Sequence, residues 1–367
     1  MRILSILLAI LLVPVAALAA LAGLLVAWSP GKTKPIKDVD GHVVPGSLSE
    51  KTWVRVNGLD QGMFIKAVDP TKPVLLFVHG FGMPGYWLTH WYRTAFEQHF
   101  TVCWWEQRGA GLSYRPDIPQ ETMVSEQFVD DLLAVADYLR ERFGQDRIYL
   151  MGHSWGSYVA LQAVAKDPSK FHAYVGVAQV VHQIRSERLS WEYMLERFRE
   201  MGNAEMARRL EAAPVDVDAP LPVAYDAIRD KAMHMLGVGT THDMRSVVTG
   251  IFLRSWWFPE YTLREKVNLW RGKVTSKRSG LWDRMQATNL AALVTELEIP
   301  AYFLHGIHDY TCCYSLGKAY AAGLSAPLVG FYSFEHSAHS PFMEEPERTI
   351  RILTEDVLQG STALADA

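Results

Sequence analysis

The chain has little cysteine, no block of basic residues and no zinc-binding helix motif, and each absence excludes a class of protein. Its three cysteines, Cys103, Cys312 and Cys313, give neither a disulfide framework nor the spacing of metal ligands. Its thirteen histidines include no His-Glu-x-x-His pair, so we expect no metal site and no cofactor. A net charge of −4 without a stripe of lysine and arginine argues against nucleic acid as a partner.

What is present is the composition of a globular protein. Hydrophobic residues make up 49% of the 367 positions and charged residues 21%, which provides an ample core and argues against disorder. A chain of this length holds either one large domain with an insertion or two ordinary domains. The order of its apolar patterns along the chain favours the first arrangement.

The N-terminus differs from the rest of the chain, because residues 3–28 contain no charge and only one polar side chain, Ser5. As a helix this stretch would be about 39 Å long at ~1.5 Å per residue, which exceeds the ~30 Å hydrocarbon core of a bilayer. We therefore predict that residues 1–28 form a single-pass membrane anchor, with the lipid bilayer as a partner. A cleaved signal peptide is the alternative, since residues 17–19 read Ala-Leu-Ala. Arg2 precedes the span and three lysines follow it, which leaves the orientation undecided.

Beyond residue 50, short apolar runs alternate with helical patterns. Residues 29–50 are rich in Pro, Gly and Lys and are typical of a linker. Strands are predicted at 53–56, 63–65, 74–78, 100–105, 148–151 and 173–180, and helices at 87–100, 124–143 and 345–358. Such alternation predicts an α/β fold with a mostly parallel sheet and helices on both faces.

The alternation stops near Val181. Residues 182–298 read as one helix after another, and the strand pattern resumes at 300–304 and 328–334. We interpret this block as a helical cap inserted before the last two strands. The predicted domains are a core of residues 51–181 and 299–360 and a cap of residues 182–298.

The most informative motif is Gly-His-Ser-Trp-Gly at residues 152–156, between a predicted strand and a predicted helix. Gly-x-Ser-x-Gly in that context is a nucleophile elbow, a sharp turn that holds the hydroxyl of Ser154 above the sheet. The glycines at both ends indicate that strand and helix pass so close that a Cβ would clash. Ser154 is thus the predicted nucleophile.

A serine hydroxyl is a poor nucleophile until a neighbouring base takes its proton, and two downstream loops supply the partners. Asp309 follows the strand at 300–304, and His339 follows the strand at 328–334, which gives the order Ser, acid, His. Both loops lie outside the carboxyl ends of strands, where open parallel sheets bind ligands. We predict that Asp309 orients the imidazole and that His339 is the general base and then the general acid.

Two backbone N–H groups are expected to form an oxyanion hole for the developing negative charge. One belongs to Trp155, directly after the nucleophile, and the other to the glycine-rich loop after the strand at 74–78, where Phe81 is the candidate.

These motifs resemble the α/β-hydrolases, and within that superfamily the proline iminopeptidase-like branch. The matching segments are residues 152–157, residues 106–113 (Glu-Gln-Arg-Gly-Ala-Gly-Leu-Ser) and residues 338–340 (Ala-His-Ser), and the resemblance spans about residues 53–358. The family usually has His-Gly-Gly-Pro-Gly in the oxyanion loop, where this chain has Phe81, Gly82 and Met83. It usually has Asp where this chain has Glu106.

The motifs predict a serine hydrolase that cleaves an ester or amide of a small molecule or short peptide through an acyl-enzyme. The resemblance adds a proline iminopeptidase-like activity, which would require a carboxylate in the cap to bind an α-ammonium group. Two alternatives stay open: a non-catalytic, hydrolase-like receptor, and a carboxylesterase or acyltransferase that uses the same residues. The cap carries five tryptophans and several glutamates, Glu187 among them, which fit either a pocket or ordinary structure.

Overall fold

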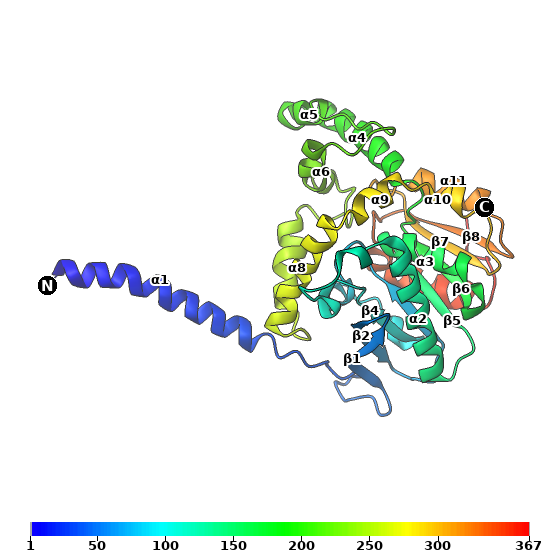
Figure 1. The fold of residues 1–367 in the computed structure, drawn as a ribbon, viewed down its shortest axis with the longest axis horizontal. Helices are drawn as coiled ribbons and strands as arrows, with labels where there is room; N and C mark the ends of the chain where they lie inside the picture. Colours follow the sequence, from blue (N-terminus) through cyan, green and yellow to red (C-terminus); the bar gives the residue numbers. More distant parts are fainter. Residues whose placement is uncertain (1, 367) are drawn as a thin grey trace.

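The computed structural model describes the backbone of residues 2–366 and the side chains of residues 12–366. Its centre is an eight-stranded sheet in the order β1-β2-β4-β3-β5-β6-β7-β8 (Figure 1). Strands β1, β2 and β4 pair antiparallel, and the pairs from β4 and β3 onward to β8 are parallel. The strands are β1 (Leu48–Val56), β2 (Leu59–Ala67), β3 (Val74–Val78), β4 (Thr101–Trp105), β5 (Ile148–His153), β6 (Phe171–Val177), β7 (Ala301–Gly306) and β8 (Val329–Phe334).

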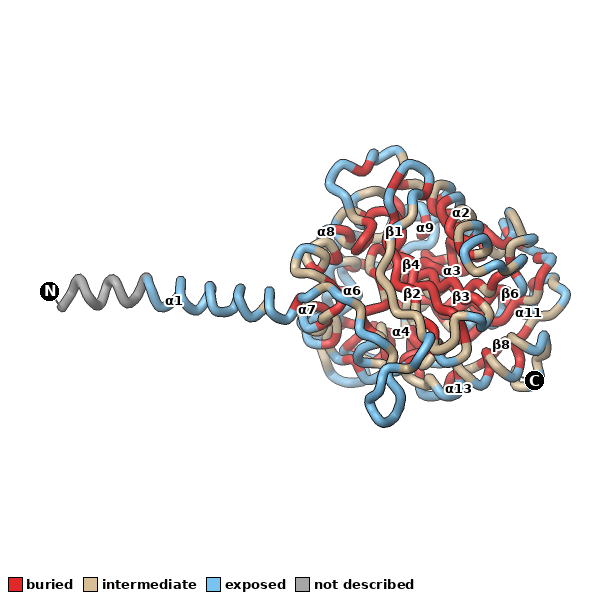
Figure 2. Tube along the Cα trace, turned by 90° about the horizontal axis from the view of Figure 1, so that it is seen from below, coloured by how far each residue is buried: buried red, intermediate tan, exposed pale blue. Residues whose placement is uncertain are grey.

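Helices cover both faces of this sheet, and alternate residues of β3 show why. Val74, Leu76 and Val78 belong to the core beneath α2 (Ser125–Phe143), α3 (Trp155–Lys166) and α11 (Tyr314–Gly323). Leu75 and Phe77 point to the opposite core, which contains α12 (Pro341–Glu344) and the final helical segment. A strand buried on both faces needs apolar residues at every position, and all five residues of β3 are buried. Figure 2 shows the strands as the most buried part of the chain.

A block of helices lies between β6 and β7, which confirms the predicted cap before the last two strands. In Figure 1 α4, α5 and α6 lie farthest from the sheet, and α8 flanks it. The helices of this block are α4 (Gln183–Glu200), α5 (Ala204–Glu211), α6 (Val223–Leu236), η6 (Val248–Phe252), α7 (Leu253–Trp257), α8 (Leu263–Arg278), α9 (Leu281–Ala287) and α10 (Leu290–Leu293).

The remaining helical segments are short. The helix predicted at 87–100 is wrong: two short 3₁₀ turns occupy this stretch, and Ala95 between them has a left-handed φ of 55°, which a continuous helix does not allow. The short segments are η1 (Tyr86–His90), η2 (Phe96–Gln98), η3 (Gly111–Ser113), η4 (Gln120–Thr122), η5 (Pro168–Lys170), α13 (Pro346–Arg351) and η7 (Ile352–Val357).

The N-terminal stretch forms one helix, α1 (Arg2–Ala27), which projects away from the body of the protein (Figures 1 and 2). Among the residues whose side chains are described, 12–366, no helix combines the length and the apolar character needed to cross a membrane. This finding contradicts the predicted membrane localisation and leaves the bilayer partner without support. The earlier part of the predicted anchor lies outside the described side chains.

The segment that follows α1 is held against the body, although the sequence is typical of a linker. We call residues 28–34 the strap. Lys266 of the cap donates hydrogen bonds to the carbonyl of Trp28 (3.1 Å) and the hydroxyl of Ser29 (2.8 Å). Farther along, the hydroxyl of Thr33 donates to the carbonyl of Ser49 in β1 (2.9 Å). The strap therefore touches the cap at one end and the edge of the sheet at the other.

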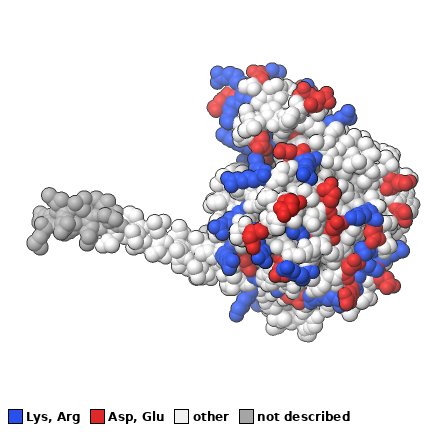
Figure 3. All heavy atoms as spheres, in the orientation of Figure 1, with Lys and Arg blue, Asp and Glu red and all other residues white. Residues whose placement is uncertain are grey.

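Charged side chains are mixed over the surface. Figure 3 shows lysine and arginine interspersed with aspartate and glutamate on the face in view. Several of them form exposed ion pairs, such as Arg199 with Glu211 and Lys166 with Asp130. Exposed pairs of this kind contribute little to stability, and this face presents no large region of one sign.

Replacing Gly156 with alanine should destabilise the fold severely. A Cβ at this position would lie 2.0 Å from the carbonyl oxygen of Val78, and a backbone atom inside the sheet cannot move aside. We expect a loss of about 3 kcal/mol or more in the free energy of unfolding, measured by urea denaturation. The matched control is Gly323→Ala, because a Cβ at Gly323 meets nothing within 4 Å. Equal unfolding midpoints for the two variants would contradict the close approach of α3 to β3.

Candidate active site

Ser154 lies at the turn between β5 and α3, in a conformation that L-residues rarely adopt. Its φ is 57° and its ψ −123°, and its N–H donates to the carbonyl of Val177 in the neighbouring strand (3.0 Å). Such strain persists only where the surroundings impose it, and it gathers at functional sites. A Cβ at Gly152 would lie 2.6 Å from the carbonyl oxygen of Gly156. The predicted need for glycine on both sides of the serine is confirmed.

Asp309 and His339 meet at the carboxyl ends of β7 and β8. The Nδ1 of His339 lies 2.9 Å from the Oδ2 of Asp309, and both side chains are buried. The other carboxylate oxygen of Asp309 accepts hydrogen bonds from the N–H groups of Thr311 (2.8 Å) and Cys312 (2.9 Å). Burial by itself would raise the pKa of Asp309, but His339 and His305 beside it hold that pKa well below its usual range. Asp309 is therefore an anion at neutral pH and fixes the imidazole by one nitrogen.

The backbone around His339 is held by a second histidine and by the cap. The Nε2 of His153 donates to the carbonyl of His339 (2.9 Å), and the N–H of His339 donates to the carbonyl of Gly239 (3.3 Å). Burial, and then the neighbouring His339, lower the pKa of His153 to about 3. A neutral imidazole has one N–H, and here the carbonyl of His339 accepts it. The sequence offered no sign of this role, because His153 occupies the variable position of the elbow motif.

Ser154 and His339 line the same cavity, which has a volume of about 510 Å³. No hydrogen bond joins the Ser154 hydroxyl to the His339 ring, although both residues are described. The Nδ1 of His339 is occupied by Asp309, so Nε2 is the nitrogen left for the serine. Catalytic hydrogen bonds of this kind are often long before substrate binds.

The predicted oxyanion loop also reaches this cavity. Phe81 lines it, and a Cβ at Gly80 would lie 3.7 Å from the Cβ of Ser154. Trp155 is the first residue of α3, so its N–H has no carbonyl partner within the helix. The rings of Phe81 and Trp155 pack edge to face with centroids 5.4 Å apart. Both expected donor residues thus lie beside Ser154.

His79 and Gln107 hold the first part of this loop. The Nδ1 of His79 donates to the carbonyl of Gly80 (2.7 Å), and its Nε2 accepts from the N–H of Gln107 (3.1 Å). Burial lowers the pKa of His79 to about 4, and the neutral ring suits one donated and one accepted hydrogen bond. The side chain of Gln107 in turn accepts from the indole of Trp155 (2.9 Å). The loop and the elbow therefore share one polar network.

The cavity has an apolar wall, to which the core and the cap both contribute, and a charged wall that belongs to the cap. Two of the cap tryptophans, Trp270 and Trp282, contribute to its wall, which answers part of the question that the sequence left open. The apolar wall includes Phe77, Met83, Trp87, Leu88, Ile251, Phe252, Phe342 and Met343. The charged wall, on α6 and α8, consists of Asp226, Arg229, Asp230, Lys273 and Lys277.

Glu187, one of the cap glutamates considered from the sequence, is engaged in hydrogen bonds within the cap. Its fully buried carboxylate accepts hydrogen bonds from Arg229 Nε (2.7 Å), Tyr225 (3.1 Å) and Gln183 (2.8 Å). With these partners it is not available to an α-ammonium group. Asp230, which pairs with Arg229 Nη1 at 2.9 Å, is the exposed carboxylate that lines the cavity instead. Sequence reasoning missed Arg229 and Asp230, because helix periodicity does not reveal which polar residue turns inward.

Glu344, which the sequence analysis did not single out, hydrogen-bonds to the loop that carries His339. Its carboxylate accepts hydrogen bonds from the N–H of Ala338 (2.9 Å) and from the N–H of His242 in the cap. Burial raises the pKa of Glu344 to about 8. The only signal in the sequence is an acidic residue shortly after the histidine loop.

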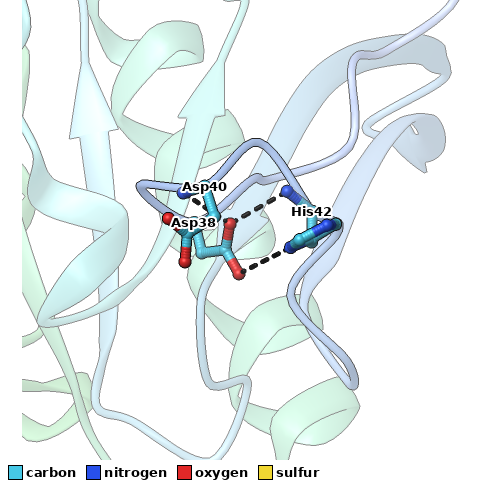
Figure 4. Close-up of side chains that lie close together, drawn as sticks. All are labelled: Asp38, Asp40 and His42. Carbon is cyan, nitrogen blue, oxygen red and sulfur yellow. Dashed lines mark hydrogen bonds and ion pairs between the residues drawn. The ribbon is translucent and has the colours of Figure 1, made fainter.

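Asp38, Asp40 and His42 are close enough together to hold a metal ion, with ligand atoms within 4.8 Å of one another (Figure 4). All three residues are exposed, and Asp38 Oδ1 already accepts from the N–H groups of Asp40 (3.0 Å) and His42 (2.9 Å). These bonds belong to the tight turn that the chain makes here. The turn accounts for the cluster.

Glu106 joins the core to the cap beneath the site. It is only 1% exposed, and its carboxylate accepts hydrogen bonds from the N–H of Leu112 (2.6 Å) and the hydroxyl of Tyr261 in the cap. Burial raises the pKa of Glu106 to about 8. A Cβ at Gly111 would lie 1.9 Å from its carboxylate oxygen, so the turn that covers Glu106 requires glycine. The longer acid at this position is thus accommodated by the loop that follows it.

Comparison with known proteins agrees with this fold. A family model described as "alpha/beta hydrolase fold" matches residues 73–217. A protein of Bacillus subtilis (strain 168) is 32% identical over 304 residues, which is 82% of this chain and 93% of the relative. The chain therefore belongs to the α/β-hydrolase family and is an enzyme of that family.

Two of the relatives are peptidases by name. The Bacillus subtilis protein is called a probable aminopeptidase, YbaC. A proline iminopeptidase of Lactobacillus delbrueckii subsp. lactis is 26% identical over 267 residues, covering 69% of this chain and 79% of the relative. The structure of a proline iminopeptidase-related protein from Thermus thermophilus matches with a TM-score of 0.54 and 19% identity, over 85% of this chain and 98% of that one. At that identity the structural match supports the fold alone.

Replacing Glu106 with glutamine should change how stability depends on pH. The folded protein keeps a proton on Glu106 up to about pH 8, whereas the unfolded chain releases it near the ordinary pKa of 4.5. Wild-type stability therefore loses up to about 1.4 kcal/mol per pH unit through this group as pH rises between these values. Glutamine does not titrate, so Glu106→Gln should gain stability relative to wild type across the window. A difference in the free energy of unfolding that stays constant from pH 4.5 to 8 would contradict this.

Proposed function

We propose that this α/β-hydrolase is a serine hydrolase with Ser154 as nucleophile, His339 as base and Asp309 as orienting acid. The observation that carries the proposal is the buried Asp309–His339 hydrogen bond in the cavity that contains the strained Ser154. An anionic carboxylate on Nδ1 fixes the tautomer and stabilises the imidazolium that forms.

The reaction has two halves. The Oγ of Ser154 attacks the substrate carbonyl carbon, and its proton passes to Nε2 of His339. His339 then gives that proton to the leaving amine or alcohol, and the carbon–heteroatom bond breaks to leave an acyl-enzyme. Water attacks the acyl carbon while His339 takes its proton, and the bond to Ser154 Oγ then breaks as His339 returns that proton to Oγ and the acid is released. The N–H groups of Phe81 and Trp155 stabilise the negative oxygen in both halves.

The substrate is an ester or amide of a small molecule or short peptide, and an aminopeptidase-like activity is the first candidate. Two of the sequence relatives are peptidases by name, which favours a peptidase, and the cavity size is that of a small-molecule site. The apolar wall suits an apolar side chain, and Asp230 at the cap end is a carboxylate that an α-ammonium group could reach. In this proposal residues 182–298 form the cap that selects the substrate. A panel of p-nitrophenyl esters and of Pro and Ala amides separates peptidase from esterase.

Ser154→Ala should abolish covalent labelling by a fluorophosphonate probe, because the probe requires an activated serine. Wild-type protein is expected to label stoichiometrically, as measured by intact mass. The control is Ser157→Ala, which removes the hydroxyl three residues along the same helix. Labelling that survives in Ser154→Ala would point to a different serine, and absence of labelling in wild type would favour a ligand-binding receptor.

His339→Ala should lower turnover by on the order of 10⁴, the cost of losing a general base in such a triad. His336→Ala provides the matched control, since His336 is exposed three residues earlier in the same loop. Its kcat should stay within about twofold of wild type. The assignment of His339 fails if His336→Ala is the more damaging change.

A further inference from the structure

The oxyanion loop, residues 79–85, contains three glycines, and at its start His79 donates a hydrogen bond to the carbonyl of Gly80. The N–H of Gln107 in turn donates to the ring of His79, as described above. Two residues after Gly80, Gly82 has a left-handed φ of 63°, a conformation that glycine enters and leaves at little cost. Phe81, the proposed oxyanion donor, lies between the fixed part of the loop and this flexible part.

Helix α8 of the cap contacts the second part of the oxyanion loop. The Nζ of Lys273 donates a hydrogen bond to the carbonyl of Phe81 (2.9 Å) and lies 5.3 Å from the centroid of the Phe81 ring. One turn along, Ser276 packs so closely on the loop that a Cβ at Gly82 would lie 2.8 Å from the Ser276 Cβ. Cap residues therefore hold both sides of the peptide unit that follows Phe81.

The hydrogen bond from Lys273 to the Phe81 carbonyl is of a strong kind. A hydrogen bond from an ammonium group to a carbonyl is charge-assisted and stronger than one between neutral groups. Burial lowers the pKa of Lys273, Asp230 and Asp226 favour its charged form, and Arg229 and Lys277 oppose it. Lys273 also lines the catalytic cavity, so this bond lies at the reaction site and not in a remote part of the cap.

We propose that Lys273 is a positioning residue that completes the oxyanion hole from the cap. By holding the peptide unit that follows Phe81, it restrains the Phe81 Cα and with it the N–H on the other side of that atom, which is directed at the substrate oxygen. The cap then contributes to transition-state stabilisation as well as to substrate selection. This inference rests on the proposed function, because it requires an oxyanion to form at Ser154.

The test compares Lys273→Met with Arg278→Met. Arg278 is an exposed cation near the end of the same helix and is not among the residues that line the cavity. Removing an oxyanion donor outright costs about 10²- to 10³-fold in kcat, so loosening one should cost about 10- to 100-fold. We expect Lys273→Met to lower kcat for p-nitrophenyl butyrate by that factor with KM changed less than about threefold. Arg278→Met should retain kcat within about twofold.

The affinity for a compound that forms a tetrahedral adduct distinguishes a positioning role of Lys273 from a merely structural one. The affinity for phenylboronic acid, which forms such an adduct with an active serine, should fall in Lys273→Met in parallel with kcat. Lys273→Arg, which can still donate to the Phe81 carbonyl, should recover at least part of both losses. If Lys273→Met does not fold, Lys273→Gln takes its place, with folding checked by circular dichroism.

Two results overturn the inference: a kcat of wild-type size in the folded Lys273→Met or Lys273→Gln variant, or equal losses in the Lys273→Met and Arg278→Met variants. Neither result touches the proposed function, which the Ser154→Ala labelling tests separately. If Ser154→Ala still labels, the proposed function fails first and the inference fails with it.

Discussion

The structure depends on how closely α3 passes the sheet. The backbone of Gly156 lies against the carbonyl of Val78, and no side chain fits between them. This approach forces the chain to turn sharply at Ser154, which accounts for the positive φ there. It also brings the end of β3, and the oxyanion loop that follows it, to the start of α3. The nucleophile, the helix N-terminus and the loop are therefore positioned by one packing constraint, not by three separate ones.

Residues of the cap contact core residues around the candidate active site, in addition to lining its cavity. Gly239 accepts a hydrogen bond from the backbone of His339, and Tyr261 donates one to Glu106 below the active-site loops. Lys273 holds the carbonyl of Phe81. Each of these cap residues contacts a different core segment. Sequence differences in the cap therefore alter the geometry around the reacting atoms as well as the shape of the pocket.

The parts of the fold and site that could be predicted are those with local signals. The elbow at Ser154 follows from glycine spacing, and Asp309 and His339 follow from their position after apolar strands. The Asp309–His339 contact agrees with that interpretation, while the catalytic roles are still predictions. The pairing of Arg229 with Glu187, or of Lys273 with Phe81, joins residues far apart in the chain, and no local pattern encodes it. The membrane localisation was predicted from composition alone, and the structure contradicts it.

The contacts of the strap restrain the cap. It is bound to Lys266 of the cap at one end and to Ser49 of β1 at the other, so it bridges the two parts of the molecule. A cap that moved away from the sheet would have to stretch or release these hydrogen bonds. The base of α1 rests on the cap through the edge-to-face contact of Trp28 with Trp257, with ring centroids 5.3 Å apart. A movement of the cap would therefore change the direction in which α1 leaves the body of the protein.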